Sequence, residues 1–210
     1  MSLDSEIIVV SGLPRSGTSL MMQMLDRGGC VALTDQIRAA DTDNPRGYFE
    51  FERVKNTKED PLWLPEARGK VVKMVSALLY DLPKTERFRV IFMQRDLGEV
   101  LESQEKMLRR LNRPAVPAEQ MRKSFEIHLQ RLFRWLPLQQ HMQVLYINYN
   151  LLLSDPESEI QKVWQFLDNR PATDPMLAAI DPSLYRNREP LKQVTYDGDK
   201  LDALPPDSIS

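Results

Sequence analysis

Residues 7–19 read IIVVSGLPRSGTS. The β-branched apolar run at 7–11 is typical of a buried central strand, and the apolar residues at 18–27 predict a buried helix. A turn with two glycines lies between them. A strand, a glycine turn and a helix start together form a cradle whose backbone N–H groups can meet an anion. We therefore expect a phosphate-binding loop directly after the first strand.

Short apolar runs alternate with helical periodicity along the rest of the chain, which predicts an α/β fold with a mostly parallel central sheet flanked by helices. Further strands are expected at 71–75, 90–93 and 144–147, and further helices at 97–111, 118–136 and 157–167. Pro137 should stop the second of these helices, and Asp155 should cap the third. Periodicity fades beyond Asn169. We expect one domain, residues 1–210, with 171–210 as an irregular C-terminal tail packed on it.

The composition excludes several classes of protein. With 42% hydrophobic and 28% charged residues among 210, the chain is expected to be globular rather than disordered. A net charge of −2 argues against a nucleic-acid partner, and no apolar run is long enough for a membrane span. One cysteine and two histidines argue against a disulfide and a metal site. The start lacks a basic leader, so the expected location is cytoplasmic. The oligomeric state cannot be read.

The loop has the glycine spacing of a nucleotide P-loop, but Thr18 stands where a kinase or NTPase has its lysine. Arg15 lies inside the loop, and its guanidinium can donate two parallel hydrogen bonds to an oxyanion. Three alternatives remain open at this point: a P-loop nucleotide kinase or NTPase, a catalytically inactive nucleotide-binding protein, and a plain tight turn in which Ser16 caps the helix.

The run GLPRSGTSLM at 12–21 resembles the 5′-phosphosulfate loop of sulfotransferases, and is most similar to the bacterial and tyrosylprotein types. The resemblance implies a P-loop NTPase-like three-layer fold. It also implies the donor 3′-phosphoadenosine 5′-phosphosulfate (PAPS), with 3′-phosphoadenosine 5′-phosphate (PAP) as product. The residues that it assigns to donor binding in this loop are Pro14, Arg15, Ser16, Gly17, Thr18 and Ser19.

Two later motifs are similar to the same family. Arg95 follows the strand at 90–93, and Ser103 lies eight residues further on, which is the spacing of the family's 3′-phosphate site. The run VLYINYNL at 144–151 resembles the family's adenine-side segment and implies that Tyr149 contacts the adenine, with Asn150 in place of the usual glutamate. The alternatives are a surface pair of Arg95 with Asp96, and Tyr149 as an ordinary aromatic residue at a strand end.

The chemical step calls for two kinds of side chain. Sulfuryl transfer needs charge stabilisation, for which Arg15 is the candidate, and a general base for the acceptor. The resemblance puts Gln36 where tyrosylprotein sulfotransferases have a glutamate, so we expect Asp35 beside it to be the base. Asp35 as a helix cap is the alternative, and Glu50, in the run DNPRGYFE at 43–50, is a competing base.

Six residues elsewhere complete the expectations. Arg186 or Arg188 could cover the 3′-phosphate from the tail, with a solvated basic turn as the alternative. His128 and His141 are expected to be packing residues. Lys73, like Lys70, is interpreted as scaffold. No metal is expected. The expected acceptor is a small molecule, glycan or peptide that offers a hydroxyl or amine.

Overall fold

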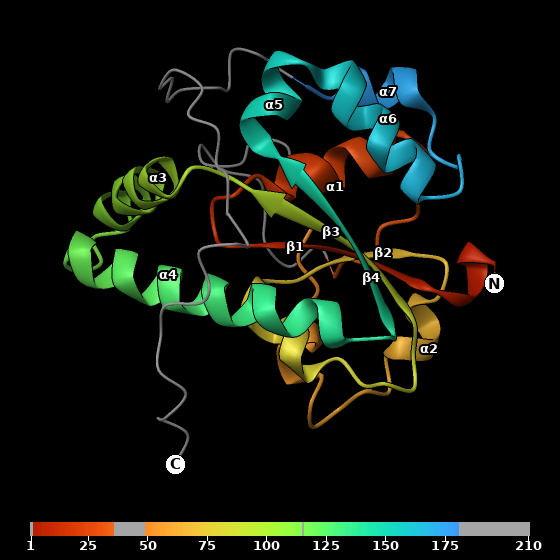
Figure 1. Ribbon diagram of the computed structural model, residues 1–210, viewed down its shortest axis with the longest axis horizontal. Coiled ribbons are helices and arrows are strands. Elements are labelled where there is room, and N and C mark those ends of the chain that lie inside the picture. Colours follow the sequence, from red (N-terminus) through yellow and green to blue (C-terminus); the bar gives the residue numbers. More distant parts are fainter. Residues whose placement is uncertain (1, 36–48, 115, 181–210) are drawn as a thin grey trace.

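The computed structural model describes residues 2–35, 49–114 and 116–180 (Figure 1). Its centre is one sheet of four strands in the order β2-β1-β3-β4, with every neighbouring pair parallel. The strands are β1 (Ile7–Gly12), β2 (Val71–Lys73), β3 (Phe88–Gln94) and β4 (Met142–Asn148). The predicted α/β class with a mostly parallel sheet is confirmed.

β1 is buried along its whole length because helices cover both faces of the sheet. Ile8 and Val10 pack into a core with α1 (Thr18–Arg27), α6 (Pro156–Phe166) and α7 (Thr173–Leu177). Ile7 and Val9 point to the other face. This double burial explains why the strand is apolar at consecutive positions instead of alternating with polar residues.

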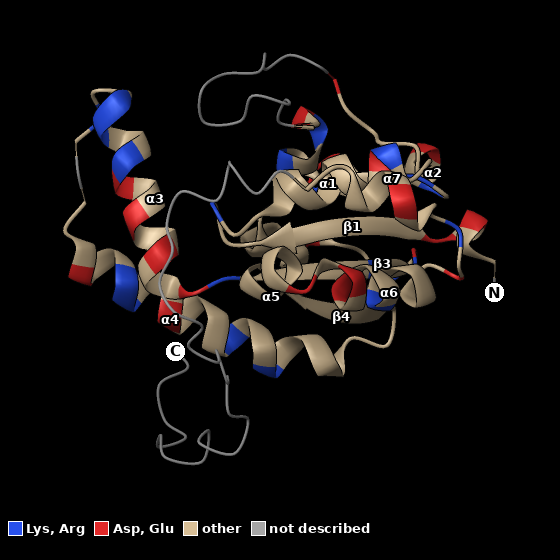
Figure 2. Cartoon of the chain, turned by 90° about the horizontal axis from the view of Figure 1, so that it is seen from above, with Lys and Arg blue, Asp and Glu red and all other residues tan. Residues whose placement is uncertain are grey.

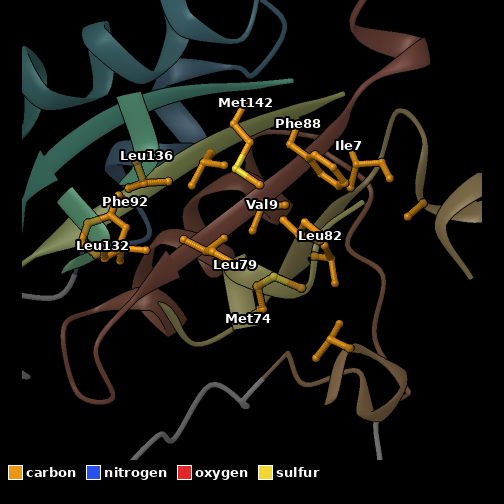
Figure 3. Close-up of a cluster of buried hydrophobic side chains, with 14 of the residues drawn as sticks. Ile7, Val9, Met74, Leu79, Leu82, Phe88, Phe92, Leu132, Leu136 and Met142 are labelled. Carbon is orange, nitrogen blue, oxygen red and sulfur yellow. The ribbon is translucent and has the colours of Figure 1, made fainter. Parts of the chain in front are cut away.

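The second face is covered by α4 (Ala118–Trp135), the short α2 (Leu64–Ala67), and the 3₁₀ turns η2 (Glu52–Asn56) and η3 (Ser76–Asp81). Figure 3 shows Ile7, Val9 and Phe92 of the sheet meeting Leu132 of α4 and Leu79 of η3 in this core. The sheet with a helical layer on each side is the expected three-layer arrangement.

The remaining elements connect these layers. η1 (Leu3–Ser5) precedes β1, η4 (Leu136–Leu138) joins α4 to β4, and α5 (Tyr149–Ser154) follows β4. α3 (Leu97–Arg110) follows β3 and stands away from the sheet, with acidic and basic residues along its length (Figure 2). None of the described helices combines the length and the apolar character needed to cross a bilayer.

Several predicted boundaries need correction. β2 ends at Lys73, two residues early, and β3 starts at Phe88, two residues before the predicted position. Asp155 is the N-cap residue of α6, yet in the described part of the chain its side chain makes no capping hydrogen bond. Part of the predicted irregular tail is helical, because α7 buries Met176 against the α1 layer. Residues 181–210 of that prediction lie outside the described residues.

The strand order places a switch point between β1 and β3. The chain leaves β1 toward one side of the sheet to form β2, and then crosses to the other side to form β3. In open parallel sheets, the crevice outside the carboxyl ends of two such strands is where ligands bind. The phosphate-loop motif follows β1 and the Arg95 motif follows β3, so the fold brings both to this crevice.

Both histidines are packed in the fold, and their burial predicts that the folded state loses stability at acid pH. His128 Nε2 lies 2.8 Å from the buried Ser76 Oγ, and His141 packs edge-on to Phe88. Burial lowers the pKa of both imidazoles below the ordinary 6.5. Protonation therefore favours the unfolded chain, so histidine-linked stability is fully present above pH 6.5 and is lost as the pH falls below it.

Thermal melting at a series of pH values checks this. We expect the melting temperature to be level from about pH 8 to about pH 7 and to fall toward about pH 5.5. The variant His141→Gln should flatten that decline. A melting temperature as high at the acid end as at neutral pH would contradict the assignment.

Candidate functional site

The loop between β1 and α1, residues 13–17, leaves the start of α1 without a side-chain cap. Gly17 is the N-cap residue of α1, in the left-handed region with φ 100°, so the alternative of Ser16 as the cap is wrong. Ser16 instead turns its hydroxyl inward, where it is buried with no hydrogen-bond partner among the described residues. An uncapped helix start beside an unpaired hydroxyl is suited to receive an anion.

The last residue of β1, from which the loop starts, lies close against the end of β3. A Cβ atom on Gly12, at φ 153°, would come within 2.8 Å of the Met93 carbonyl oxygen and 2.4 Å of Ser16 Oγ. Position 12 therefore has no room for a side chain. The loop's approach to β3 brings it next to the second motif, which begins where β3 ends.

The two motifs exchange hydrogen bonds through their arginines. Arg15 Nε donates to Ser103 Oγ on α3 at 3.0 Å. Arg95 Nη1 donates to the backbone carbonyl of Arg15 at 3.1 Å. Each arginine thus contacts the motif to which the other belongs. The two predicted anion sites are one continuous structure at the switch point between β1 and β3.

Arg95 is held in a largely buried environment. Its side chain is 10% exposed, and its Nε donates to Glu99 Oε2 at 2.8 Å. Asp96 does not pair with Arg95 but caps α3 by accepting the Glu99 N–H at 3.1 Å. The alternative of an Arg95–Asp96 surface pair is therefore wrong.

Tyr149 links the phosphate loop to Arg95. It is the first residue of α5, and the Arg95 guanidinium carbon lies over its ring, 4.4 Å from the ring centre. A Cβ atom on Gly17 would come 2.3 Å from Cδ2 of the same ring, so only glycine fits there. The ring thus contacts both the loop and Arg95.

Lys73 is a candidate site residue that the sequence analysis missed. It ends β2, on the other side of β1 from β3, and its Nζ lies 3.4 Å from Ser19 Oγ in the first turn of α1. Lys73 therefore adds a third cationic side chain beside Arg15 and Arg95 at the carboxyl edge. The available signal was a lysine within the strand predicted at 71–75. Only the structure shows that Lys73 ends this strand and that the strand lies beside β1.

The two candidate bases lie next to each other. Asp35 N donates to the Glu50 carbonyl at 3.1 Å, and Asp35 Oδ2 accepts the N–H of Glu52 at 2.6 Å. Ala32 pairs in parallel with Val71 of β2, so the chain runs from there to Asp35 toward the carboxyl edge of the sheet. The Asp35 carboxylate thus accepts the first N–H of η2. The alternative of Asp35 as a cap for the segment after Thr34 falls on residues 36–48, outside the described residues.

The other residues singled out in the sequence either lie outside the described residues or pack elsewhere. Gln36, Arg186 and Arg188 lie outside the described residues. His128 is bonded to Ser76 on the face covered by α4, as a packing residue would be.

The sheet, the loop after β1 and the helix that follows define an α/β protein of the P-loop NTPase-like class. The family model for the sulfotransferase domain matches residues 5–194 of the chain. The chain therefore belongs to the sulfotransferase family. Membership confirms the resemblance seen in the loop, and it supports an enzyme that transfers sulfate. No curated protein matches the chain by sequence.

Solved structures show the same fold. The sulfotransferase domain from the curacin biosynthetic pathway is 14% identical, with a TM-score of 0.50, over 84% of this chain and 78% of that one. The sulfotransferase domain from the Synechococcus PCC 7002 olefin synthase is also 14% identical, with a TM-score of 0.51, over 100% of this chain and 92% of that one.

Proposed function

We propose that this sulfotransferase takes its sulfuryl group from PAPS and passes it to a hydroxyl or amine of a small molecule, glycan or peptide. The observation that carries the proposal is the pair of hydrogen bonds that joins Arg15 to Ser103 and Arg95 to the Arg15 carbonyl. An adenosine nucleotide with phosphate groups on both its 5′ and 3′ positions needs two adjacent anion sites, and this pair of bonds makes the two motifs adjacent.

The residues present fit such a donor. Ser16 offers a buried hydroxyl without a partner among the described residues, and Arg15, Lys73 and Arg95 supply positive charge around the loop. Bound PAPS would supply the sulfuryl group and a 5′-phosphate as leaving group. Pro14, Gly17, Thr18 and Ser19 would complete the loop around the phosphosulfate.

Each charged residue has a distinct role in the proposal. Arg15 neutralises charge that develops as the sulfuryl group leaves, and Lys73 does so from the β2 side. Arg95 and the Ser103 hydroxyl bind the 3′-phosphate, for which charge-assisted hydrogen bonds are the strongest means. Tyr149 presents its edge or hydroxyl to the adenine. Arg188 would cover the 3′-phosphate.

The proposed base is Asp35, with Glu50 as the competing residue. Asp35 lies on the stretch that runs from Ala32 toward the carboxyl edge beside β2, where Lys73 also ends, and its N–H donates to the Glu50 carbonyl. The Glu52 N–H fixes the orientation of the Asp35 carboxylate, because it donates to Oδ2. The role of the base is to take the acceptor proton, so its loss should lower transfer while nucleotide binding is kept.

We place the reaction in the cytoplasm.

Ligand preference tests the proposal. Calorimetric titration of the full chain should give tighter binding of PAP than of adenosine 5′-phosphate or ATP, by about tenfold or more. Incubation with PAPS and a panel of phenols, alcohols, amines and sugars should then yield a sulfated product. Equal binding of ATP with no gain from the 3′-phosphate would overturn the proposal and favour an NTPase. Tight PAP binding with no transfer to any acceptor would favour an inactive nucleotide-binding protein.

A further inference from the structure

We infer that Glu99 and Asn150 position Arg95 and thereby set the protein's preference for a nucleotide with a 3′-phosphate. The inference rests on the proposed function, and it concerns two residues that do not themselves touch the ligand. Glu99 lies in the first turn of α3 and Asn150 in the first turn of α5. The two helices follow β3 and β4, which are neighbours in the sheet.

Glu99 is a buried carboxylate that serves Arg95. Its side chain is 2% exposed, and Oε2 accepts the Arg95 Nε–H at 2.8 Å. An ionised carboxylate is costly to bury unless it is paired and hydrogen-bonded. Its position next to Arg95 therefore indicates a specific use. By taking the Nε–H, Glu99 fixes the plane of the guanidinium and determines where the Nη groups point.

Asn150 holds the other oxygen of the same carboxylate. Its Nδ2 donates to Glu99 Oε1 at 2.9 Å. Asn150 is in turn held because Asn148, the N-cap of α5, accepts the Asn150 N–H at 2.9 Å. Glu99 is thus fixed at both oxygens, by a cation on one side and a neutral amide donor on the other.

The neutral amide at position 150 fits the charge of the cluster. A carboxylate there would face Glu99 at hydrogen-bond distance, and two carboxylates at such a distance cannot both ionise without repulsion. That repulsion would pull Glu99 out of line with Arg95. Asn150 is therefore a positioning residue that acts on Arg95 through Glu99.

Two further contacts, besides Glu99, restrict the orientation of the Arg95 guanidinium. The Tyr149 ring covers one face of the guanidinium, and the Arg15 carbonyl accepts a hydrogen bond from Nη1. With Nε on Glu99, the three contacts together determine the orientation of the group. A guanidinium binds a phosphate through two parallel N–H groups, so its orientation decides whether the second bond can form.

The test is the ratio of PAP affinity to adenosine 5′-phosphate affinity, measured by calorimetry on the full chain. Glu99→Asp keeps the charge but shortens the side chain, and Asn150→Leu keeps the size but removes the donor. Each should lower the ratio by about threefold to tenfold, the effect of one lost hydrogen bond, with adenosine 5′-phosphate affinity nearly unchanged. Asn150→Asp should lower it more than Asn150→Leu does, although aspartate matches asparagine more closely in shape.

Matched controls separate positioning from a general effect on the fold. Glu105→Asp changes an exposed glutamate on the same helix, paired with Arg109, and should leave the ratio unchanged. In an Arg95→Ala background, neither Glu99→Asp nor Asn150→Leu should lower the ratio further, because the residue through which they act is gone.

The outcomes distinguish this inference from the proposed function. If the wild-type chain binds PAP no better than adenosine 5′-phosphate, both fall. If the wild type shows the preference and the Glu99 and Asn150 variants keep it, the positioning role alone is wrong. The positioning role is also wrong if the variants weaken both nucleotides equally, or if their effect persists without Arg95.

Discussion

Arg95→Ala should remove most of the protein's preference for PAP over adenosine 5′-phosphate. In the proposed complex, Arg95 contributes charge-assisted hydrogen bonds to the 3′-phosphate, each worth about 1.5–3 kcal/mol, so PAP affinity should fall by roughly 10- to 100-fold. Adenosine 5′-phosphate has no 3′-phosphate, and its affinity should change by no more than about threefold. Parallel calorimetric titrations with the two nucleotides measure this difference directly.

The Arg95→Ala experiment must allow for Glu99, which is also bonded to Arg95. Removal of the arginine leaves the Glu99 carboxylate buried without its cation, which costs about 3–5 kcal/mol of folding stability in buried pairs. Arg95→Lys keeps a charge beside Glu99 and loses only the planar fork, so it should fold better and still lose part of the preference. Arg109→Ala removes an exposed arginine and serves as the control. An unchanged preference in both Arg95 variants would mean that the 3′-phosphate binds elsewhere.

The strand, turn and helix of residues 7–27 could be predicted because their signals are local in sequence. A β-branched run, two glycines and a helical apolar pattern lie within residues 7–27, and each acts on its own backbone. The structure forms β1, the turn and α1 at these positions. The Arg95 motif is similarly local, because a strand end and a helix start enclose it.

Contacts between motifs could not be read from such patterns. Arg15 and Ser103 are 88 residues apart, and Lys73 and Ser19 are 54 apart. They meet because β2 and β3 lie on opposite sides of β1, and this order is set by packing of the whole sheet. The sequence alone therefore indicates only a scaffold role for Lys73, although this residue ends a strand next to the loop.

Short elements escaped prediction for a different reason. α7 has five residues, too few for a periodic pattern, and its stability comes from burying Met176 against the α1 layer. Glu99 gave no signal either, since a glutamate in the first turn of a helix is ordinarily explained by the helix dipole. Only its burial and its two hydrogen-bonded partners distinguish it from the exposed acids of α3.

Arg15→Gly should lower the rate of sulfuryl transfer by about 100- to 1,000-fold, the usual effect of losing one donor that stabilises developing charge. Glycine is the informative replacement because Arg15 has φ 68°, a conformation that costs side-chain-bearing residues about 1–2 kcal/mol. The backbone carbonyl that accepts the Arg95 hydrogen bond is retained. The variant therefore deletes the guanidinium while the bond from the second motif to the loop remains.

Two measurements on Arg15→Gly separate chemistry from folding. Its melting temperature should equal or exceed that of the wild type, because the strained residue is relieved. Its kcat with PAPS should fall, while PAP, which lacks the sulfuryl group, should bind with a smaller loss, about tenfold or less. Arg109→Ala is again the control. A kcat within about tenfold of the wild type would remove Arg15 from the chemical step and leave Lys73 as the cation that carries it.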